Sequence, residues 1–203
     1  FRNNGSGSGS GNNKPFVIFA DNGSDGTGTQ IRYANDTSSP NFDLLGGTGL
    51  PTSNTWHHLA IVRSSGTVYG YLDGALTNSA TDNTNYSTND SVTIGNSSGV
   101  SLNFDGSIQD YRIYKGLAKY TSNFVPASIN PDIIPDTPSG VAFKSQLSDS
   151  EKGSVGFDGG SDCIIVRDHA DLRFGTNPFT IECWVYFESI TTSTYPSIFS
   201  KYT

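Results

Sequence analysis

The chain of 203 residues carries a formal net charge of -7, and its 12 lysines and arginines are scattered rather than clustered. Nucleic acids and anionic membrane surfaces are bound by clustered basic side chains, so this composition weighs against both as partners. No apolar run is long enough to cross a bilayer, which predicts no membrane insertion. The 23 glycines and the 12% of aromatic residues are instead typical of an all-β protein with many tight turns.

Short apolar or alternating segments predict strands from the head of the chain onward. A low-complexity run of Gly, Ser and Asn at residues 1–13 predicts a loop. Within residues 55–64 the apolar side chains alternate with polar ones, which predicts a strand buried on one face only. The strands predicted in this part of the chain are residues 14–21, 30–34, 55–64, 67–72, 75–76, 91–95 and 105–114.

A proline-rich segment separates these strands from a second group. Four prolines between residues 123 and 139 forbid a central strand and favour extended, polyproline-like backbone. Residues 128–152 are therefore interpreted as a connector, with one short strand at residues 141–144. The elements predicted beyond the connector are strands at residues 154–159, 162–166 and 178–188 and one helical turn at residues 170–174.

The two ends of the chain read as one β-hairpin when they are joined tail to head. Residues 196–203 are typical of a strand, and residues 9–20 are typical of a glycine-rich turn followed by a partner strand. Because Met is absent, residue 1 is not expected to be an encoded start. We therefore expect the later part of a domain to come first in this chain and the opening of a domain to come last.

Three motifs occur in the spacing of a single domain. Residues 155–166, followed by Phe-Thr-Ile-Glu-Cys-Trp-Val-Tyr at 179–186, resemble the opening of laminin-G-like domains of the concanavalin A-like jelly-roll superfamily. Trp-His-His-Leu-Ala-Ile-Val-Arg at 56–63 is similar to the middle of such a domain, as is Tyr-Leu-Asp-Gly at 71–74. Residues 104–116 resemble its closing strand. The resemblance implies an all-β, two-sheet antiparallel jelly-roll sandwich whose sequence is out of phase with the domain.

The segment at residues 114–126 is similar to tandem laminin-G-like repeats of large virion proteins in marine phages and of bacterial surface proteins. The resemblance divides the chain into three parts. Residues 1–127 correspond to the middle and C-terminal part of a sandwich, residues 128–152 to the proline-rich connector, and residues 153–203 to the N-terminal strands of a sandwich.

Three arrangements explain this order. The chain is a window on a longer tandem array, a circular permutation in which residues 153–203 fold back on residues 1–127, or a polymerising subunit whose last strands complete the next subunit. An incomplete sandwich would expose apolar strand edges, so the missing strands are expected from within the chain or from a neighbour. The expected partners are therefore copies of the chain or adjacent repeats, contacted through strands at residues 154–203.

Aromatic and histidine residues in the strands suggest sites that core packing also explains. Trp56 and Trp184 lie in alternating apolar strands, which favours the core for both over sugar stacking. His57 and His58 are adjacent and point to opposite faces of a strand, so we expect one buried and one surface imidazole and no metal pair. His169 lies in an acidic turn that we interpret as a solvated loop.

Calcium is the one cofactor considered, because related jelly rolls often bind it through several oxygen ligands. In the pentraxin branch of the superfamily an acidic loop follows a strand that resembles residues 92–95. Here residues 96–99 in that position are Asn-Ser-Ser-Gly, without a carboxylate, which argues against such a site. Asp21 and Asp25 are the remaining candidate metal ligands.

Catalytic residues are not predicted. Glycoside hydrolases of this fold pair two carboxylates on one strand face. Glu182 shares its face with Thr180 and Trp184, and neither is an acid. Cys163 and Cys183 form one disulfide or remain free thiols, and their sequence context leaves both alternatives open.

The sequence thus favours a non-catalytic structural or adhesive module of an extracellular or virion assembly. The alternative is a lectin-like module that binds cell-surface glycans. For that alternative we expect an exposed aromatic side chain beside converging polar groups, with Tyr86 and Tyr195 as the candidate glycan-binding residues.

Overall fold

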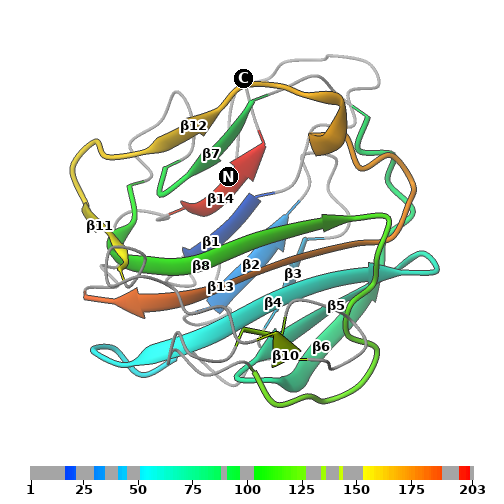
Figure 1. The fold of residues 1–203 in the computed structure, drawn as a ribbon, viewed down its shortest axis with the longest axis horizontal. Coiled ribbons are helices and arrows are strands. Elements are labelled where there is room, and N and C mark those ends of the chain that lie inside the picture. Colours follow the sequence, from blue (N-terminus) through cyan, green and yellow to red (C-terminus); the bar gives the residue numbers. More distant parts are fainter. Residues whose placement is uncertain are drawn as a thin grey trace.

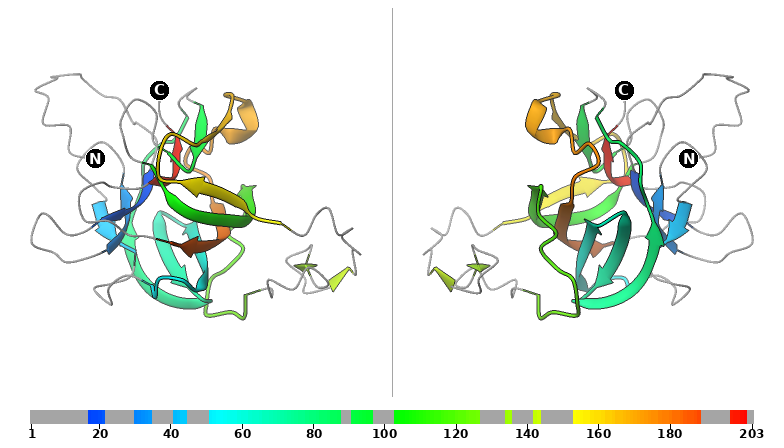
Figure 2. Two further views of the ribbon diagram at one scale, coloured as in Figure 1. Left: turned by 90° about the vertical axis from the view of Figure 1, so that its left-hand side faces the viewer. Right: turned by 90° about the vertical axis from the view of Figure 1, so that its right-hand side faces the viewer.

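The computed structural model confirms an all-β sandwich of two antiparallel sheets packed face to face (Figures 1 and 2). One short 3₁₀ helix, η2 (Ala170–Leu172), is the only helix in the part of the chain that the structure describes. The described residues are 17–21, 30–34, 41–44, 51–87, 91–96, 103–126, 134–135, 142–143, 153–188 and 197–201. No helix among them has the length and apolar character needed to cross a membrane.

The first sheet has six strands in the order β12-β7-β14-β1-β2-β3, and the second has six in the order β11-β8-β13-β4-β5-β6. The strands of the first sheet are β1 (Val17–Asp21), β2 (Gln30–Ala34), β3 (Asn41–Asp43), β7 (Val92–Ile94), β12 (Ile164–Val166) and β14 (Ser197–Lys201). The strands of the second are β4 (Trp56–Ser64), β5 (Thr67–Leu72), β6 (Ala75–Thr81), β8 (Asp105–Lys115), β11 (Val155–Asp158) and β13 (Phe179–Phe187). A separate two-stranded ladder pairs β9 (Ile134–Pro135) with β10 (Ala142–Phe143).

Strands from the two ends of the sequence interleave in both sheets. β13 pairs with β8 on one side and β4 on the other, and β14 lies between β7 and β1. The tail-to-head pairing predicted from the sequence is confirmed, because Val17 pairs with Ser200 in an antiparallel register. Within this one chain the late strands therefore fill gaps in both sheets, which is the arrangement that the circular-permutation alternative expects.

The core lies between the sheets and is filled by every second residue of the central strands. The odd-numbered residues of β13, from Phe179 to Phe187, are all buried in this core. On β4, Leu59 and Ile61 enter it, and Phe199 of β14 packs from the facing sheet. The even-numbered residues of β4 and β13 consequently point to the outer face of the second sheet.

β4 differs from its predicted half-buried character, because all residues from His58 to Arg63 are buried. A second, smaller apolar cluster on the outer face explains the difference. Ala60, Val62 and Tyr71 pack there against Tyr120 and Phe124 of the segment that follows β8. β3 and β9 were not predicted, and both are too short to give a periodic signal.

Candidate functional site

The outer face of the second sheet carries the side chains that are candidates for binding. The side chains on this face form rows that run across the strands. In one row Trp184 stands opposite His58, and in another Tyr186 stands opposite Trp56. The next row places Glu182 beside Ala60 of β4 and Arg112 of β8. Strand pairing thus brings residues more than a hundred positions apart onto one surface.

Residues 116–126, here called the strap, cross one half of this face. The Thr180 hydroxyl donates to the carbonyl oxygen of Leu117 and accepts from the Lys119 amide, both at 2.9 Å. At the far end the Phe124 amide donates to the carbonyl oxygen of Gly74 at 2.9 Å. Gly74 has a φ of +79°, and a Cβ there would lie 1.9 Å from the Phe124 oxygen, so only glycine allows this approach.

A buried ionic cluster lies beneath the strap. Lys119 Nζ is 2.5 Å from Glu182 Oε1 and lies over the rings of Tyr114 and Tyr120, at 4.7 and 5.0 Å from their centroids. His58 Nε2 is 3.6 Å from Glu182 Oε2, and both side chains are almost fully buried. The burial of His58 lowers the pKa of its imidazole, partly offset by the Glu182 carboxylate. Burial, together with a hydrogen bond to Glu182, raises the pKa of the Tyr120 hydroxyl.

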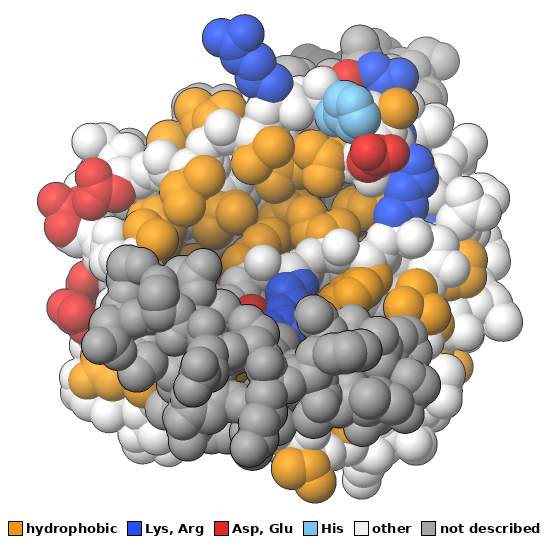
Figure 3. Space-filling view, in the orientation of Figure 1, with side chains coloured by type: hydrophobic (Ala, Val, Ile, Leu, Met, Phe, Trp, Pro, Cys, Tyr) orange, Lys and Arg blue, Asp and Glu red, His pale blue; other side chains and the backbone are white. Residues whose placement is uncertain are grey.

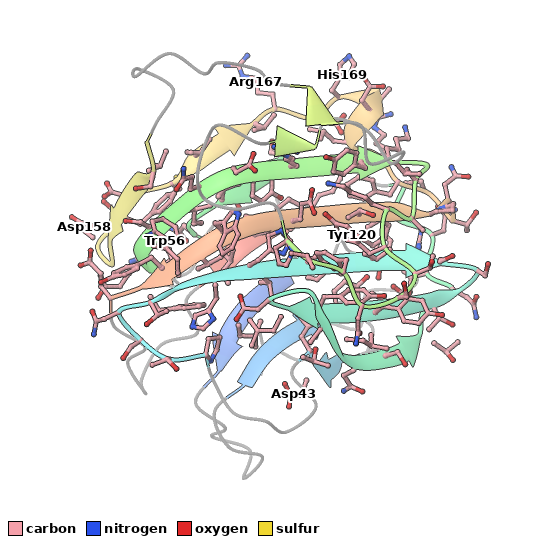
Figure 4. The ribbon with its side chains drawn as sticks, turned by 60° about the horizontal axis from the view of Figure 1, so that its bottom comes forward. Asp43, Trp56, Tyr120, Asp158, Arg167 and His169 are labelled. Atoms are coloured by element: carbon pink, nitrogen blue, oxygen red, sulfur yellow. The ribbon has the colours of Figure 1, made fainter. Side chains whose placement is uncertain are left out.

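The other half of the face carries an aromatic surface formed by Trp56, Trp184 and Tyr186. All three side chains are half-buried rather than enclosed. The rings of Trp56 and Tyr186 are 5.5 Å apart, and Trp184 meets His58 edge to face at 5.2 Å. Figure 4 shows Trp56 and Tyr120 toward opposite ends of this face, so the strap and the aromatic surface divide it between them.

Two polar side chains border the aromatic surface. Gln109 of β8 stands opposite Trp184 and is partly exposed. Asn54 is exposed, and its Oδ1 is 3.5 Å from the Tyr186 hydroxyl. The face therefore combines aromatic planes with amide groups that can donate and accept hydrogen bonds.

Core packing, which the sequence favours for Trp56 and Trp184, is wrong for both. Apolar side chains occupy both faces of the strand at residues 179–187. Alternation alone therefore does not show which face of this strand meets the core. The five odd-numbered positions fill it, and the tryptophans fall on the even-numbered outer face.

The two adjacent histidines have different partners, as their opposite orientation predicts. His57 Nδ1 lies 2.8 Å from Asp73 Oδ2, and its Nε2 lies 3.2 Å from the carbonyl oxygen of Thr52. The His58 amide donates to Asp73 Oδ1 at 2.8 Å, while the His58 ring faces Glu182. His57, the imidazole expected at the surface, is also largely covered, because the turn at Asp73 folds against it.

Tyr86 is fully buried, which corrects the expectation that it is an exposed sugar-binding ring. Its hydroxyl lies 2.8 Å from Asp82 Oδ2 and 2.7 Å from the hydroxyl of Tyr33. The Tyr86 side chain instead points inward and completes a hydrogen-bonded group in the core. The second glycan-binding candidate, Tyr195, lies outside the described residues.

Tyr86 belongs to what we call the Arg63 latch, formed by Arg63, Asp82, Tyr86 and Phe179. The Arg63 guanidinium lies 4.9 Å from the Tyr86 ring centroid and 4.8 Å from that of Phe179. It donates to the carbonyl oxygens of Thr84 at 2.7 Å, Gly175 at 2.6 Å and Asn177 at 2.9 Å. The final residue of the Trp-His-His-Leu-Ala-Ile-Val-Arg motif therefore ties an early loop to a late one.

The candidate metal ligands do not form a described site. Asp21 is the last residue of β1 and pairs with Gln30, and Asp25 lies outside the described residues. The part of the chain that the structure describes contains no group of three or more His, Cys, Asp or Glu side chains arranged to hold a metal ion. His169 is exposed in its acidic turn, as expected, with Nδ1 at 3.2 Å from Asp171 Oδ2.

Both cysteines are free thiols, which decides between the two alternatives left by the sequence. Cys163 is exposed just before β12, whereas Cys183 is buried in the core on β13. Burial raises the pKa of the Cys183 thiol, so this side chain behaves as a small apolar core residue.

A family model described as the concanavalin A-like lectin/glucanases superfamily, within the laminin G group, matches residues 2–119. The chain belongs to this superfamily. The match covers more than half of the sequence and includes the motif that ends at Arg63, and it agrees with the two-sheet sandwich. Searches of curated proteins and of solved structures found no match.

Proposed function

We propose that this superfamily member is a non-catalytic adhesive module that binds carbohydrate on the aromatic surface of its second sheet. The observation that carries the proposal is the pair of partly exposed tryptophans, Trp56 and Trp184, in neighbouring rows of one face. Tyr186 extends the same surface. The superfamily includes lectins and glucanases, so a sugar ligand is consistent with its membership.

The chemistry of the surface suits a pyranose chain. The C–H groups on one face of a pyranose ring are apolar and pack on aromatic planes, while its hydroxyls need hydrogen-bonding partners at the edge. Trp and Tyr combine a large apolar area with a polar group and are suited to partly hydrated contacts. Gln109 and Asn54 provide amide groups beside the rings.

The buried ionic cluster supports binding without hydrolysis. Glycoside hydrolysis uses two carboxylates, one of which must donate a proton to the leaving sugar. Glu182 lies under the strap, with one carboxylate oxygen held by Lys119 at 2.5 Å. A carboxylate held in this way positions the strap rather than a substrate.

The proposed setting is the surface of a virion or a cell. The support is the laminin-G-like character of the chain and the similarity of residues 114–126 to tandem repeats of virion and surface proteins. The strap coincides with that segment, and its Tyr120 and Phe124 rings stack at 3.5 Å. The similarity therefore falls on residues with a defined structural role.

Affinity electrophoresis in gels containing laminarin, xylan or alginate tests the proposal. We expect at least one polysaccharide to retard the wild-type protein, and Trp184→Ala or Trp56→Ala to weaken the retardation by about tenfold, since a lost stacking contact of about 1.4 kcal/mol corresponds to that factor. Tyr69→Ala removes a half-buried aromatic ring at the strap end of the same sheet and should bind normally.

Circular dichroism of each variant separates loss of binding from loss of folding. If none of the three polysaccharides retards the wild-type protein, or if Tyr69→Ala is affected as strongly as the tryptophan variants, the aromatic surface is not the binding site.

An architectural role is the second candidate. It is favoured by the exposed apolar side chains of β12 at the edge of the first sheet. Natural proteins rarely leave such edges uncovered, so a structural contact is a specific explanation for them. The association state of the protein tests this role independently of sugar binding.

A further inference from the structure

His58 lies where the strap and the aromatic surface meet. Its ring meets Phe124 of the strap edge to face, with 5.6 Å between the ring centroids, and meets Trp184 in the same way at 5.2 Å. The His58 side chain is almost fully buried between them. A change in the charge of this ring would therefore act on both halves of the face at once.

The polar groups beneath the strap are only partly satisfied. Glu182 Oε1 is paired with Lys119, but His58 Nε2 lies 3.6 Å from Glu182 Oε2, which is too long for a hydrogen bond. Among the described residues, neither His58 Nδ1 nor Glu182 Oε2 has a hydrogen-bond partner, although both atoms are buried. Buried polar atoms without partners are costly, so a rearrangement that joins the imidazole to the carboxylate is favoured.

Charged groups face the His58 ring from every element packed around it. They are Glu182 of β13, Lys119 of the strap, Asp73 in the turn between β5 and β6, and Asp110 of β8. Burial lowers the pKa of the His58 imidazole, the Glu182 carboxylate partly offsets this, and the Lys119 charge lowers the pKa further. His58 is therefore neutral at pH 7 while the strap is in place.

The two aspartates near His58 already have partners. Asp110 Oδ1 accepts from Arg112 Nε at 2.7 Å. Asp73 Oδ1 accepts from the His58 amide, and Asp73 Oδ2 lies 2.8 Å from His57 Nδ1. Figure 3 shows basic and acidic side chains side by side near the middle of the view, at the level where Figure 1 places β8 and β13. A protonated His58 ring would therefore compete with the strap for the carboxylate of β13.

We propose that the strap is an acid-released cover, in which protonated His58 displaces Lys119 from Glu182. In the closed arrangement Glu182 is paired with Lys119, and His58 is neutral. When the strap lifts, water reaches the ring and the lysine charge leaves, so the imidazolium can form its own ion pair with Glu182. Because the open arrangement holds the proton more tightly than the closed one, its population rises as the pH falls below about 6.5.

The strap is attached in a way that allows it to lift while the sheets stay folded. None of its residues belongs to a strand. Its described backbone and amide bonds to the second sheet lie at Leu117 and Lys119 near one end and at Asn123 and Phe124 near the other. Segments with few backbone hydrogen bonds and partly exposed side chains open more readily than central strands.

Release of the strap would lengthen the face proposed to bind sugar. Ala60, Val62 and Tyr71 pack against Tyr120 and Phe124 in the closed arrangement and would become accessible. Tyr71 stands opposite Ala60, so its ring would continue the aromatic surface across the sheet. This consequence rests on the proposed function, whereas the release of the strap does not.

Hydrogen exchange followed by mass spectrometry measures strap release without any ligand. We expect the protection of the strap amides, corrected for the intrinsic exchange rate at each pH, to fall about tenfold between pH 7.5 and pH 5.5 while β13 stays protected. His58→Gln removes the titrating ring and should abolish this fall. His169→Gln is the matched control, because it removes an exposed histidine outside the strap and should respond like the wild type.

The fluorescence of Trp184 reports the proton on His58 in a second, independent measurement. The chain has two tryptophans, so Trp56→Phe leaves Trp184 as the single emitter, and a protonated imidazole in contact with an indole quenches it. We expect a quenching midpoint below about pH 6.5. Adding Lys119→Met should move the midpoint upward, because the cation of the strap no longer opposes the proton.

The possible results separate this inference from the sugar-binding proposal. Equal strap protection at both pH values, the same fall in His58→Gln as in the wild type, or a fluorescence midpoint that Lys119→Met does not move would overturn the acid-released cover. Affinity electrophoresis at pH 7.5 and pH 5.5 tests the consequence for binding. Stronger retardation of the wild type at pH 5.5, absent in His58→Gln, supports a lengthened face, and equal retardation at both pH values contradicts it. If the strap is released but no polysaccharide retards the protein at either pH, the sugar-binding proposal fails and the acid-released cover stands.

Discussion

The Arg63 latch and the Lys119 strap both bury a cation against the second sheet, but they satisfy it in different ways. Arg63 donates to three backbone carbonyl groups and lies between two aromatic rings, with Asp82 at 4.0 Å. Lys119 is paired with the side-chain carboxylate of Glu182 and also donates to the Tyr114 hydroxyl at 3.2 Å. The first cation is held largely by backbone groups, and the second by the side chains of Glu182 and Tyr114.

The positions of the two groups explain the difference. The Arg63 latch joins loops near residues 82–86 and 174–177, so it connects the early and late parts of the chain through the interior. The strap lies on the outer face and covers one half of it. The Arg63 latch therefore links two parts of the chain inside the protein. The strap holds a surface segment in place and leaves the aromatic surface beside it open.

The largest predicted effect comes from the Arg63 latch. Arg63→Ala removes the guanidinium that donates to the carbonyl groups of Thr84, Gly175 and Asn177, and we expect it to lower the free energy of unfolding by about 3–5 kcal/mol. Urea denaturation measures the change. Arg167→Ala removes an exposed arginine and should change stability by less than about 0.5 kcal/mol. A similarly small loss for Arg63→Ala would show that the latch does not hold the two parts together.

The strap should respond less strongly. Lys119→Met leaves Glu182 as a buried carboxylate without its cation, and we expect a loss of about 2–3 kcal/mol. The double variant Lys119→Met with Glu182→Leu should recover to within about 1 kcal/mol of the wild type, because an apolar pair can replace a buried ion pair. A double-mutant cycle by urea denaturation measures the coupling, and strictly additive losses would contradict it.

The smallest effect is the pH dependence that His58 contributes. Because burial lowers the pKa of His58 in the folded protein, the unfolded chain takes up its proton first as the pH falls. The contribution of neutral His58 is therefore complete above the unfolded pKa of about 6.5 and is lost as the pH falls from there toward the lowered folded pKa. Measuring the free energy of unfolding of His58→Gln and of the wild type between pH 8 and pH 5 isolates the contribution of His58. Parallel stability curves for the two proteins would contradict the assignment.

The sequence predicted most of the fold because the strands have strong local signals. The alternating segments predicted β4, β8 and β13, and the tail and head strands were correctly expected to pair. The helical turn predicted at residues 170–174 corresponds to η2. The residues on one face of β13 were also correct, since Thr180, Glu182 and Trp184 share the outer face.

The candidate site was less predictable because it depends on contacts between distant segments. Apolar residues occur on both faces of β13, so the choice of core face needs the position of the other sheet. Arg63 contacts carbonyl groups up to 114 positions away, and a backbone carbonyl leaves no mark in the sequence. Tyr86 was misplaced for this reason, as its buried hydrogen bond depends on Asp82 and Tyr33.

The pairing of β1 with β14 has a mechanical consequence. β1 begins at Val17 and β14 ends at Lys201, and the first residue pair, Val17 with Ser200, lies at the same end of both strands. A tension applied through the two chain ends would therefore separate one residue pair after another, starting at this end. It would not load all the pairs in shear at once. For the adhesive role proposed above, the direction of pull would decide how long the attachment lasts.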